Sequence, residues 1–457
     1  MPARPERTAP PALRPGSPSP PTLRPSGRLL GLLLAVTALA ALAALLSKQW
    51  CRLNGWVEPG MHVHMCYSDF AQLFPTRGLA DGHFPFFTPL PEEQWMEYPA
   101  LLAVVAGVTA WFVPDTGSLH ERTVQYFDVN ALGVVLCWAV LVVATAHTAR
   151  ARARDALLVA LAPTVILTSM LNWDLWAVML AGLALWAWSA ERPVLAGALL
   201  GLGTATKLYP LFFFGALLVL ALRTGRWREF GGALAAGAVA WAAVNVPFML
   251  TAFDQWSRFY TFSGEREVSF SSVWLALHWT GWSGATFSLL SNGLFALCCA
   301  GVLWLGLAAP VRPRLAQLCM LIVASFLLLG KVYSPQFVMW LVPLVVLANP
   351  RPRQFWIWQA AEVLHWAGLW VSLSRATAGE GFGPVWVQAW YVLGIAVHMA
   401  ALIWVCVTVI RDILDPSRDP VRRTALTHGG QVAPGVGEDP NAGVFAGVED
   451  RLVLRTR

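Results

Sequence analysis

The chain has 457 residues, of which 57% are hydrophobic and 13% charged, and its formal net charge at pH 7 is +6. Soluble domains carry about a quarter charged residues. Because apolar runs long enough to cross a bilayer recur along the chain, the composition excludes a set of soluble domains and predicts an all-α polytopic membrane protein. The basic residues follow the positive-inside pattern of membrane proteins, so the net charge does not indicate a nucleic-acid partner.

The N-terminal residues 1–27 are rich in Pro, Arg and Ser. This composition cannot bury a core, and we expect a disordered cytoplasmic tail. The apolar segment 28–47 is too long for a signal peptide and lacks a cleavage site, so we interpret it as the first membrane span. Basic residues precede this span, which places the N-terminus inside.

A large first outer loop is expected over residues 48–128. It contains Cys51 and Cys66, which form a disulfide in an oxidising compartment or else remain free thiols. The apolar stretch 99–113 in this loop is too short to cross a bilayer, so we expect a juxtamembrane or re-entrant helix there. The second true span is then 129–148.

A break at Lys207-Leu208-Tyr209-Pro210 interrupts a later apolar run. Two half-length helices around this break satisfy the topology if all basic clusters are cytoplasmic, and such breaks are tolerated where they line a cavity. With these half helices the chain has about twelve spans, the others being 156–171, 174–190, 230–249, 286–309, 315–330, 336–349, 354–372 and 385–410. Residues 413–457 combine Gly, Pro and mixed charge, and are expected to be a disordered cytoplasmic tail.

The lysines of this chain are few, and the expected topology places all three of them, Lys48, Lys207 and Lys331, on the outer side. An unpaired Lys in hydrocarbon costs about 3 kcal/mol on insertion scales, so we expect an anion near Lys207 and Lys331. Tyr209 and Tyr333 each follow one of these lysines by two residues, and a phenol adds a second hydrogen bond to a phosphate. The alternative for both lysines is snorkelling to the interface, which suits Lys207 less well because it interrupts an apolar run.

Asp69 is the candidate catalytic residue, because it is an acidic group in the first outer loop with Tyr67 and Phe70 beside it. A carboxylate held there could act as a general base toward a sugar or lipid hydroxyl. The alternative is an ordinary interfacial Asp after a helix.

Two outer arginines, Arg258 and Arg266, are candidates for clamping a phosphate or leaving group. Arg266 could equally pair with a neighbouring glutamate. His365 lies within a span, which makes it either a functional residue or a satisfied core histidine.

Several other polar residues have a structural reading that is at least as good as a functional one. Glu97 lies at the start of the juxtamembrane helix, and Asn172 and Asp174 occupy a tight outer turn where they could cap a helix or contact a substrate hydroxyl. His62 and His64 lack a partner cluster, so they indicate a surface loop rather than a metal site.

Five motifs together resemble glycosyltransferase family 87, the actinobacterial polyprenol-phosphate-mannose-dependent mannosyltransferases of the GT-C fold. The resemblance covers about residues 28–412, which it implies are a GT-C transmembrane catalytic domain. The motifs occur in this order: Cys66-Tyr67-Ser68-Asp69, Glu97-Tyr98-Pro99, Asn172-Trp173-Asp174, Lys207-Leu208-Tyr209-Pro210 and Lys331-Val332-Tyr333-Ser334-Pro335-Gln336.

The resemblance implies roles for single residues. Asp69 matches the catalytic Asp of the family's first outer loop, Lys207 and Tyr209 match a motif near the donor phosphate, and His365 is the nearest match to a membrane histidine that contributes in a relative. Phe70 and Ala71 follow Asp69, so the Asp-x-Asp motif of eukaryotic relatives is missing and no metal or other cofactor is expected.

The function expected from the residues and the resemblance is transfer of a sugar, expected to be mannose, from a polyprenyl-phosphate donor to a glycolipid or cell-wall glycan. The reaction would invert the anomeric centre at the outer leaflet of the plasma membrane. A transporter or flippase of a lipid-linked sugar phosphate is the alternative, because the same lysines could pass a phosphate across. The long first outer loop and the lack of an internal repeat favour the enzyme.

Overall fold

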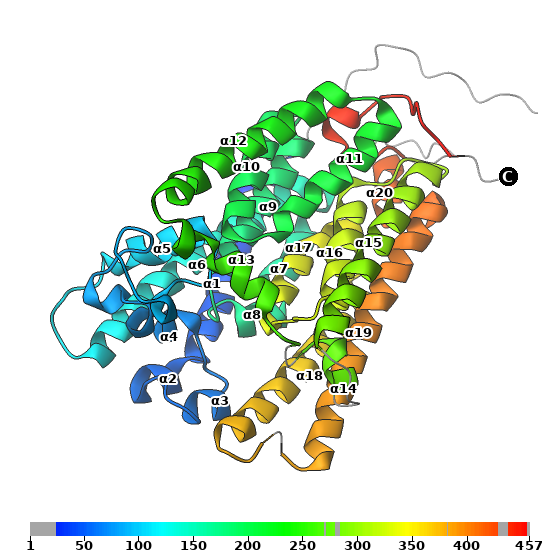
Figure 1. The fold of residues 1–457 in the computed structure, drawn as a ribbon. Coiled ribbons are helices and arrows are strands. Elements are labelled where there is room, and N and C mark those ends of the chain that lie inside the picture. The colour runs from blue at the N-terminus through cyan, green and yellow to red at the C-terminus, as the bar shows by residue number, and fades with distance from the viewer. Residues whose placement is uncertain (1–23, 269–270, 279–283, 382, 428–436, 455–457) are drawn as a thin grey trace, which may run out of the picture.

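The computed structural model describes residues 24–454 except 269–270, 279–283, 382 and 428–436. The described residues form helices joined by loops, without a β-strand (Figure 1), which confirms the predicted all-α class. Among them, five helices are long and apolar enough to cross a membrane, as expected of a multi-pass membrane protein. They are α1 (Gly27–Leu46), α6 (Leu119–Ala149), α12 (Trp227–Thr251), α15 (Gly284–Ala308) and α19 (Val385–Leu414).

Helix α6 begins well before the predicted span 129–148. A capping box explains this start, because the Ser118 side chain accepts a hydrogen bond from the backbone of Glu121 and the Glu121 side chain accepts one from the backbone of Ser118. Such a box satisfies N–H groups that would otherwise lack partners at a helix start. The first ten residues of the helix, 119–128, therefore belong to the region predicted as the first outer loop.

The predicted pair of half-length helices is present. Helix α10 (Pro193–Thr206) ends at Lys207, the short turn η4 (Tyr209–Leu211) follows, and α11 (Phe212–Thr224) continues the chain. Pro210 lies in the turn, where its missing N–H costs no helical hydrogen bond. Lys207 therefore caps the end of α10, and α10 packs against α12.

The predicted span 156–171 is wrong as a single helix. The structure has α7 (Ala156–Ala160) and α8 (Pro163–Thr168), separated at Leu161 and Ala162. Pro163 explains the break, because proline disfavours a helical residue before it and favours the first turn of a new helix. Helix α9 (Asp174–Ser189) then starts at the tight turn that the sequence predicts.

The first outer loop folds into short helices. They are α2 (Gln49–Asn54), α3 (Gly60–Val63), α4 (Asp69–Thr76), η1 (Leu79–Asp81), η2 (Glu92–Gln94) and α5 (Ala100–Ala110). Helix α5 confirms the short helix predicted within 99–113, and Cys51 and Cys66 form a disulfide. Figure 1 shows α2, α3 and α4 at one end of the molecule and α20 (Pro420–Thr427) at the opposite end.

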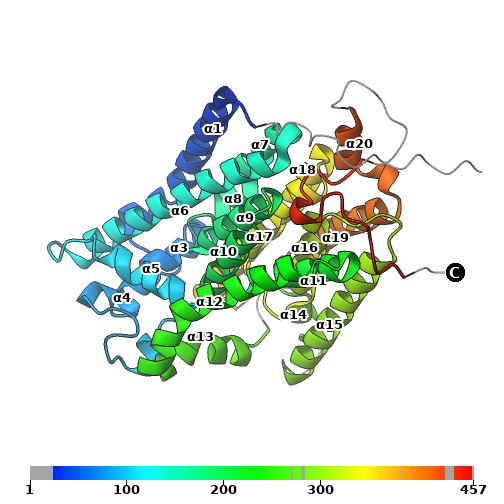
Figure 2. The same ribbon diagram turned by 90° about the horizontal axis from the view of Figure 1, so that it is seen from above.

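The remaining helices close the bundle. They are α13 (Phe253–Glu265), α14 (Val273–His278), α16 (Leu315–Leu329), η5 (Pro335–Phe337), α17 (Val338–Ala348) and α18 (Pro352–Thr377). Every residue of α17 is buried, and Figure 2 shows this helix in the middle of the bundle. The core therefore sits around α17, with the outer loop covering one end.

The C-terminal segment differs from the disordered tail expected over 413–457. Beyond α19 the chain forms η6 (Pro416–Arg418), α20 and η7 (Gly443–Phe445), and Asp450 pairs with Arg223 at 2.8 Å and Arg312 at 2.7 Å. Arg223 is buried near the end of α11 and needs a counterion, which Asp450 in this segment supplies. Residues 1–23 of the expected N-terminal tail lie outside the described residues.

Candidate active site

A cavity of about 480 Å³ opens at the end of the bundle that carries the first outer loop. Its walls come from that loop, from α13, from the segment before η5 and from α18. Among the residues that line it are Asp69, Lys207, Arg266, Tyr333 and Gln336. Segments distant in sequence thus place a carboxylate, two cations and polar side chains around one space.

Asp69 is the first residue of α4, and two tyrosines hold its carboxylate. The Tyr67 hydroxyl donates to Oδ1 at 2.7 Å, and the Tyr98 hydroxyl donates to Oδ2. The backbone N–H of Asp69 donates to the carbonyl of Leu171 at 2.7 Å, and Lys48 Nζ donates to the carbonyl of Tyr67 at 3.1 Å. These contacts fix the carboxylate in one orientation at the cavity wall.

The surroundings of Asp69 also set its protonation. Burial raises the pKa of the Asp69 carboxyl above its ordinary value, although the hydrogen bonds from Tyr98 and Tyr67 and the charge of Lys207 lower it. The pKa values of Tyr67 and Tyr98 lie well above the ordinary value because of burial first and the Asp69 charge second, so both phenols remain donors at neutral pH. A carboxylate with a raised pKa is a stronger base than one in water.

Lys207 lies over the ring of Tyr98, whose hydroxyl donates to Asp69. Its Nζ is 2.8 Å from Asp174 Oδ1 and 4.7 Å from the centre of the Tyr98 ring. The Lys207 charge therefore has a partner within the protein, and the membrane cost of a lone Lys does not by itself require a bound anion. Asp174, which is completely buried, also accepts a hydrogen bond from Trp340 Nε1 at 2.9 Å.

Asn172 completes a chain of hydrogen bonds between the two charges. Its Nδ2 donates to the Tyr98 hydroxyl at 3.1 Å, and its Oδ1 accepts from the backbone N–H of Asp174 at 3.0 Å. Asn172 and Asp174 thus form the turn before α9 and its first residue, and their side chains link Tyr98 and Lys207.

Three further predicted site residues line the cavity. Arg266 is exposed, lies over the Phe262 ring at 5.9 Å, and has no carboxylate within ion-pair distance in the described part of the chain. Gln336 lies at the cavity wall, and Glu97 also lines the cavity and pairs with Arg77 at 2.8 Å. Of these, Arg266 offers the charge that an anionic ligand needs.

Three predicted phosphate-binding residues do not line the cavity. Tyr209 is 1% exposed and stacks on Trp340 with ring centres 4.5 Å apart. Lys331 Nζ donates to the carbonyl of Gly264 at 2.8 Å, and Arg258 pairs with Glu92 at 3.4 Å. Each of these side chains contacts another part of the protein. In this geometry none of the three is directed at a phosphate in the cavity.

His62 and Tyr98 line the cavity, although neither was assigned a role at a site from the sequence. His62 was expected in a surface loop, but its side chain is 7% exposed, lines the cavity, and has Nδ1 3.3 Å from Thr377 Oγ1. Tyr98 stands between an acid and a proline at the start of a short outer helix, and this position was the only available signal. His365 is buried and does not line the cavity; it lies with Glu362 and His398 on α18 and α19.

The model of glycosyltransferase family 87 matches residues 95–330, which is more than half of the chain. The chain belongs to glycosyltransferase family 87. It is therefore a glycosyltransferase, as its motifs suggested. The family match includes Lys207, Asn172 and Arg266 and begins after Asp69.

A solved structure similar to this family 87 chain is that of ArnT from Cupriavidus metallidurans bound to undecaprenyl phosphate. The similarity has a TM-score of 0.44 and 15% sequence identity, and it covers 91% of this chain and 84% of that chain. A search of curated proteins found no significant match to the family 87 chain.

Proposed function

We propose that this family 87 enzyme transfers a sugar, mannose in the first instance, from a polyprenyl-phosphate donor to a hydroxyl of a glycolipid or cell-wall glycan. The observation that supports this proposal is that Asp69 and Lys207 line the same cavity, joined through Tyr98, Asn172 and Asp174. A base and a cation are what transfer from a phosphate leaving group requires.

In the proposed reaction Asp69 takes the proton from the acceptor hydroxyl. The acceptor oxygen forms a bond to the anomeric carbon from the face opposite the phosphate, the bond between that carbon and the phosphate oxygen breaks, and polyprenyl phosphate leaves. A single displacement of this kind inverts the anomeric centre. The carboxylate is suited to this step because both of its oxygens are oriented and its pKa is raised by burial.

Arg266 and Lys207 are the proposed partners of the donor phosphate. Arg266 has no counterion in the described part of the chain, and its planar guanidinium matches a phosphate. The Lys207 side chain is 12% exposed at the cavity and pairs with Asp174. Its charge is therefore partly neutralised, and it would attract the phosphate less strongly than a free lysine. Placed at the end of the molecule with the first outer loop, the cavity would face the extracytoplasmic leaflet of the plasma membrane.

The test is transfer by the purified full-length protein in lipid nanodiscs, with radiolabelled polyprenyl-phosphate mannose and a lipid extract as acceptor. We expect labelled glycolipid with the wild type and at least about a 10²-fold lower rate with Asp69→Asn, because a positioned base contributes that much. Asp128→Asn, which removes an acid paired with Arg52 elsewhere in the outer region, is the matched control.

Two outcomes would contradict the proposal. Transfer that is unaffected by Asp69→Asn would remove the base assignment. Movement of intact donor across a vesicle membrane without transfer to any acceptor would favour a flippase. If transfer is observed, a lipid profile of a deletion strain would identify the acceptor, because the precursor that accumulates carries the free hydroxyl.

A further inference from the structure

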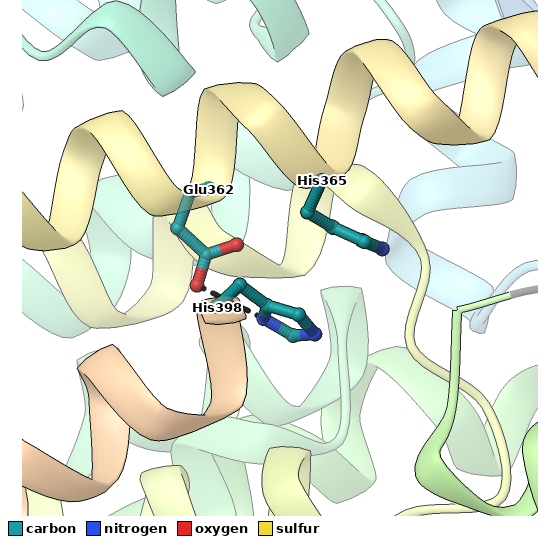
Figure 3. A group of neighbouring side chains, drawn as sticks. All are labelled: Glu362, His365 and His398. Carbon is teal, nitrogen blue, oxygen red and sulfur yellow. Dashed lines mark hydrogen bonds and ion pairs between the residues drawn. The ribbon is translucent and has the colours of Figure 1, made fainter. Parts of the chain in front are cut away.

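Helices α18 and α19 carry a second group of buried polar side chains (Figure 3). Glu362 and His365 are three residues apart on α18 and so share a face, and His398 comes from α19. Each is at most 2% exposed. One ligating atom from each of the three side chains lies within 4.8 Å of the other two, and the two imidazole rings are stacked with centres 4.2 Å apart.

The carboxylate of this group is well supplied with hydrogen bonds. Glu362 Oε1 accepts from Trp358 Nε1 at 3.0 Å, Oε2 accepts from the Tyr333 hydroxyl at 3.0 Å, and His398 Nδ1 is 3.4 Å from Oε1. These contacts hold the carboxylate in place beside the imidazoles.

In each of the two imidazoles, one ring nitrogen lacks a hydrogen-bond partner among the described residues. The Nε2 atoms of His365 and His398 are buried and have no hydrogen-bond partner in the described residues. A buried polar atom without a partner costs about 1–3 kcal/mol, and here two such atoms belong to neighbouring rings. With the ring proton on Nδ1, each of these Nε2 atoms has a lone pair that a metal ion can accept.

We propose that Glu362, His365 and His398 bind a divalent transition metal ion of the zinc class. Two imidazoles and one carboxylate are ligands that zinc accepts, with a fourth position left for water or another group. Glu and His three residues apart on one helix, facing a partner helix, form a metal-binding pattern of helix bundles. The donors from Trp358 and Tyr333 would orient the carboxylate ligand, as the outer partners of metal ligands do.

The metal would have a structural role next to the active-site cavity. It would join α18 to α19, whose connecting segment at the outer end is only 378–384. Tyr333 links the site to the cavity, since the residue lines the cavity and its hydroxyl donates to Glu362. This site is separate from Asp69, and a metal here would depart from the expectation, based on the sequence, that the protein uses no metal or other cofactor.

The test is the metal content of the full-length protein, purified with an affinity tag that contains no histidine and measured by plasma mass spectrometry. We expect about one zinc per chain in the wild type. His365→Gln and His398→Gln should lower the zinc content at least about tenfold, whereas His365→Cys should retain it because thiolate is also a zinc ligand. His147→Gln, at a histidine stacked on Trp186, is the control that should keep the metal.

A second measurement covers the case in which a variant does not fold. Wild-type protein stripped with a chelator should gain the visible absorption of tetrahedral cobalt when Co²⁺ is added, and its melting temperature should rise with the metal. Wild type that contains no metal and binds neither Zn²⁺ nor Co²⁺ would overturn the proposal, as would glutamine variants with unchanged metal content. Asp69→Asn should bind metal like the wild type, so failure of the proposed transfer reaction would leave this result distinct.

Discussion

At the residue scale, Asp69 and Lys207 act as parts of one network rather than as separate groups. Tyr98 donates to Asp69, accepts from Asn172, and lies with its ring face toward Lys207. Removal of the Tyr98 hydroxyl alone should therefore alter Asp69 and leave the ring beside Lys207 in place. Such a variant would separate the role of the Asp69 carboxylate from that of the hydrogen bond that Tyr98 donates to it.

Tyr98→Phe should move the acid limb of the activity profile to higher pH. The hydrogen bond from Tyr98 lowers the pKa of Asp69, so its loss should raise that pKa further above the ordinary value. Because the base must be ionised to act, activity falls as the pH drops through the pKa, and in the variant it should fall earlier. The measurement is kcat/KM against pH, with Tyr126→Phe, whose hydroxyl bonds Ala106, as control. An unchanged acid limb would argue against Asp69 as the base.

Lys207→Met should impair both stability and donor use. The substitution leaves Asp174 buried without its cation, which costs about 3–5 kcal/mol, and removes a charged contact to the phosphate worth about 10- to 100-fold in kcat/KM. The double variant Lys207→Met, Asp174→Asn should regain most of the melting temperature but not the activity. Recovery of both would mean that Lys207 serves the fold alone.

At the element scale, the half helix α10 is placed by close contact with α12. A Cβ atom at Gly197 would come within 1.9 Å of the Ala233 carbonyl oxygen, and one at Gly201 within 2.1 Å of that of Gly237. Only glycine lets the two backbones approach this closely. The end of α10 carries Lys207, so this contact also positions the site.

Gly197→Val should lower the melting temperature and the transfer rate together. The new side chain would push α10 and α12 apart, and Lys207 at the end of α10 would shift. Overpacking of this kind costs about 1–3 kcal/mol or more. Gly231→Ala is the matched control, because a Cβ there meets no atom within 4 Å. Thermal unfolding of both variants in the same detergent is the measurement. Equal melting temperatures would show that the two helices are not held as closely as described.

At the scale of the whole molecule, the cavity and the ordered C-terminal segment lie at opposite ends. The first outer loop, with its disulfide, forms part of the cavity wall, whereas Asp450 and Asp419 pair with arginines at the far end. If the cavity faces outward, as proposed, the positive-inside rule places the arginines at the far end in the cytoplasm and the disulfide in the oxidising compartment.

Cysteine labelling should report this orientation. Asp115→Cys lies in the outer loop at a side chain that is 93% exposed, and should react with a membrane-impermeant maleimide on intact cells. Glu191→Cys lies in the exposed turn between α9 and α10 and should react only after permeabilisation. The wild type, treated in parallel, gives the background from its own cysteines. The reverse pattern would place the cavity in the cytoplasm.

The sequence by itself determined the properties that are local along the chain. Apolar runs predict helices, Pro210 after Lys207 predicts the break between α10 and α11, and the short run near Ala100 predicts a short helix, because each depends on neighbouring residues. Cys51 and Cys66, close in one outer loop, could be paired on the same basis. Pro163 carried a similar local signal for the break between α7 and α8, which the prediction of one span did not use.

Only the tertiary structure decided which side chains meet. Asp69 and Tyr98 are 29 residues apart, and Asp174 and Trp340 are 166 apart. The partner of Lys207, the burial of Tyr209 and the approach of His398 to Glu362 all depend on how separate helices pack. A hydropathy pattern fixes which segment enters the membrane, but it leaves free the rotation and neighbours of each helix, and these set the contacts of every polar residue in the site.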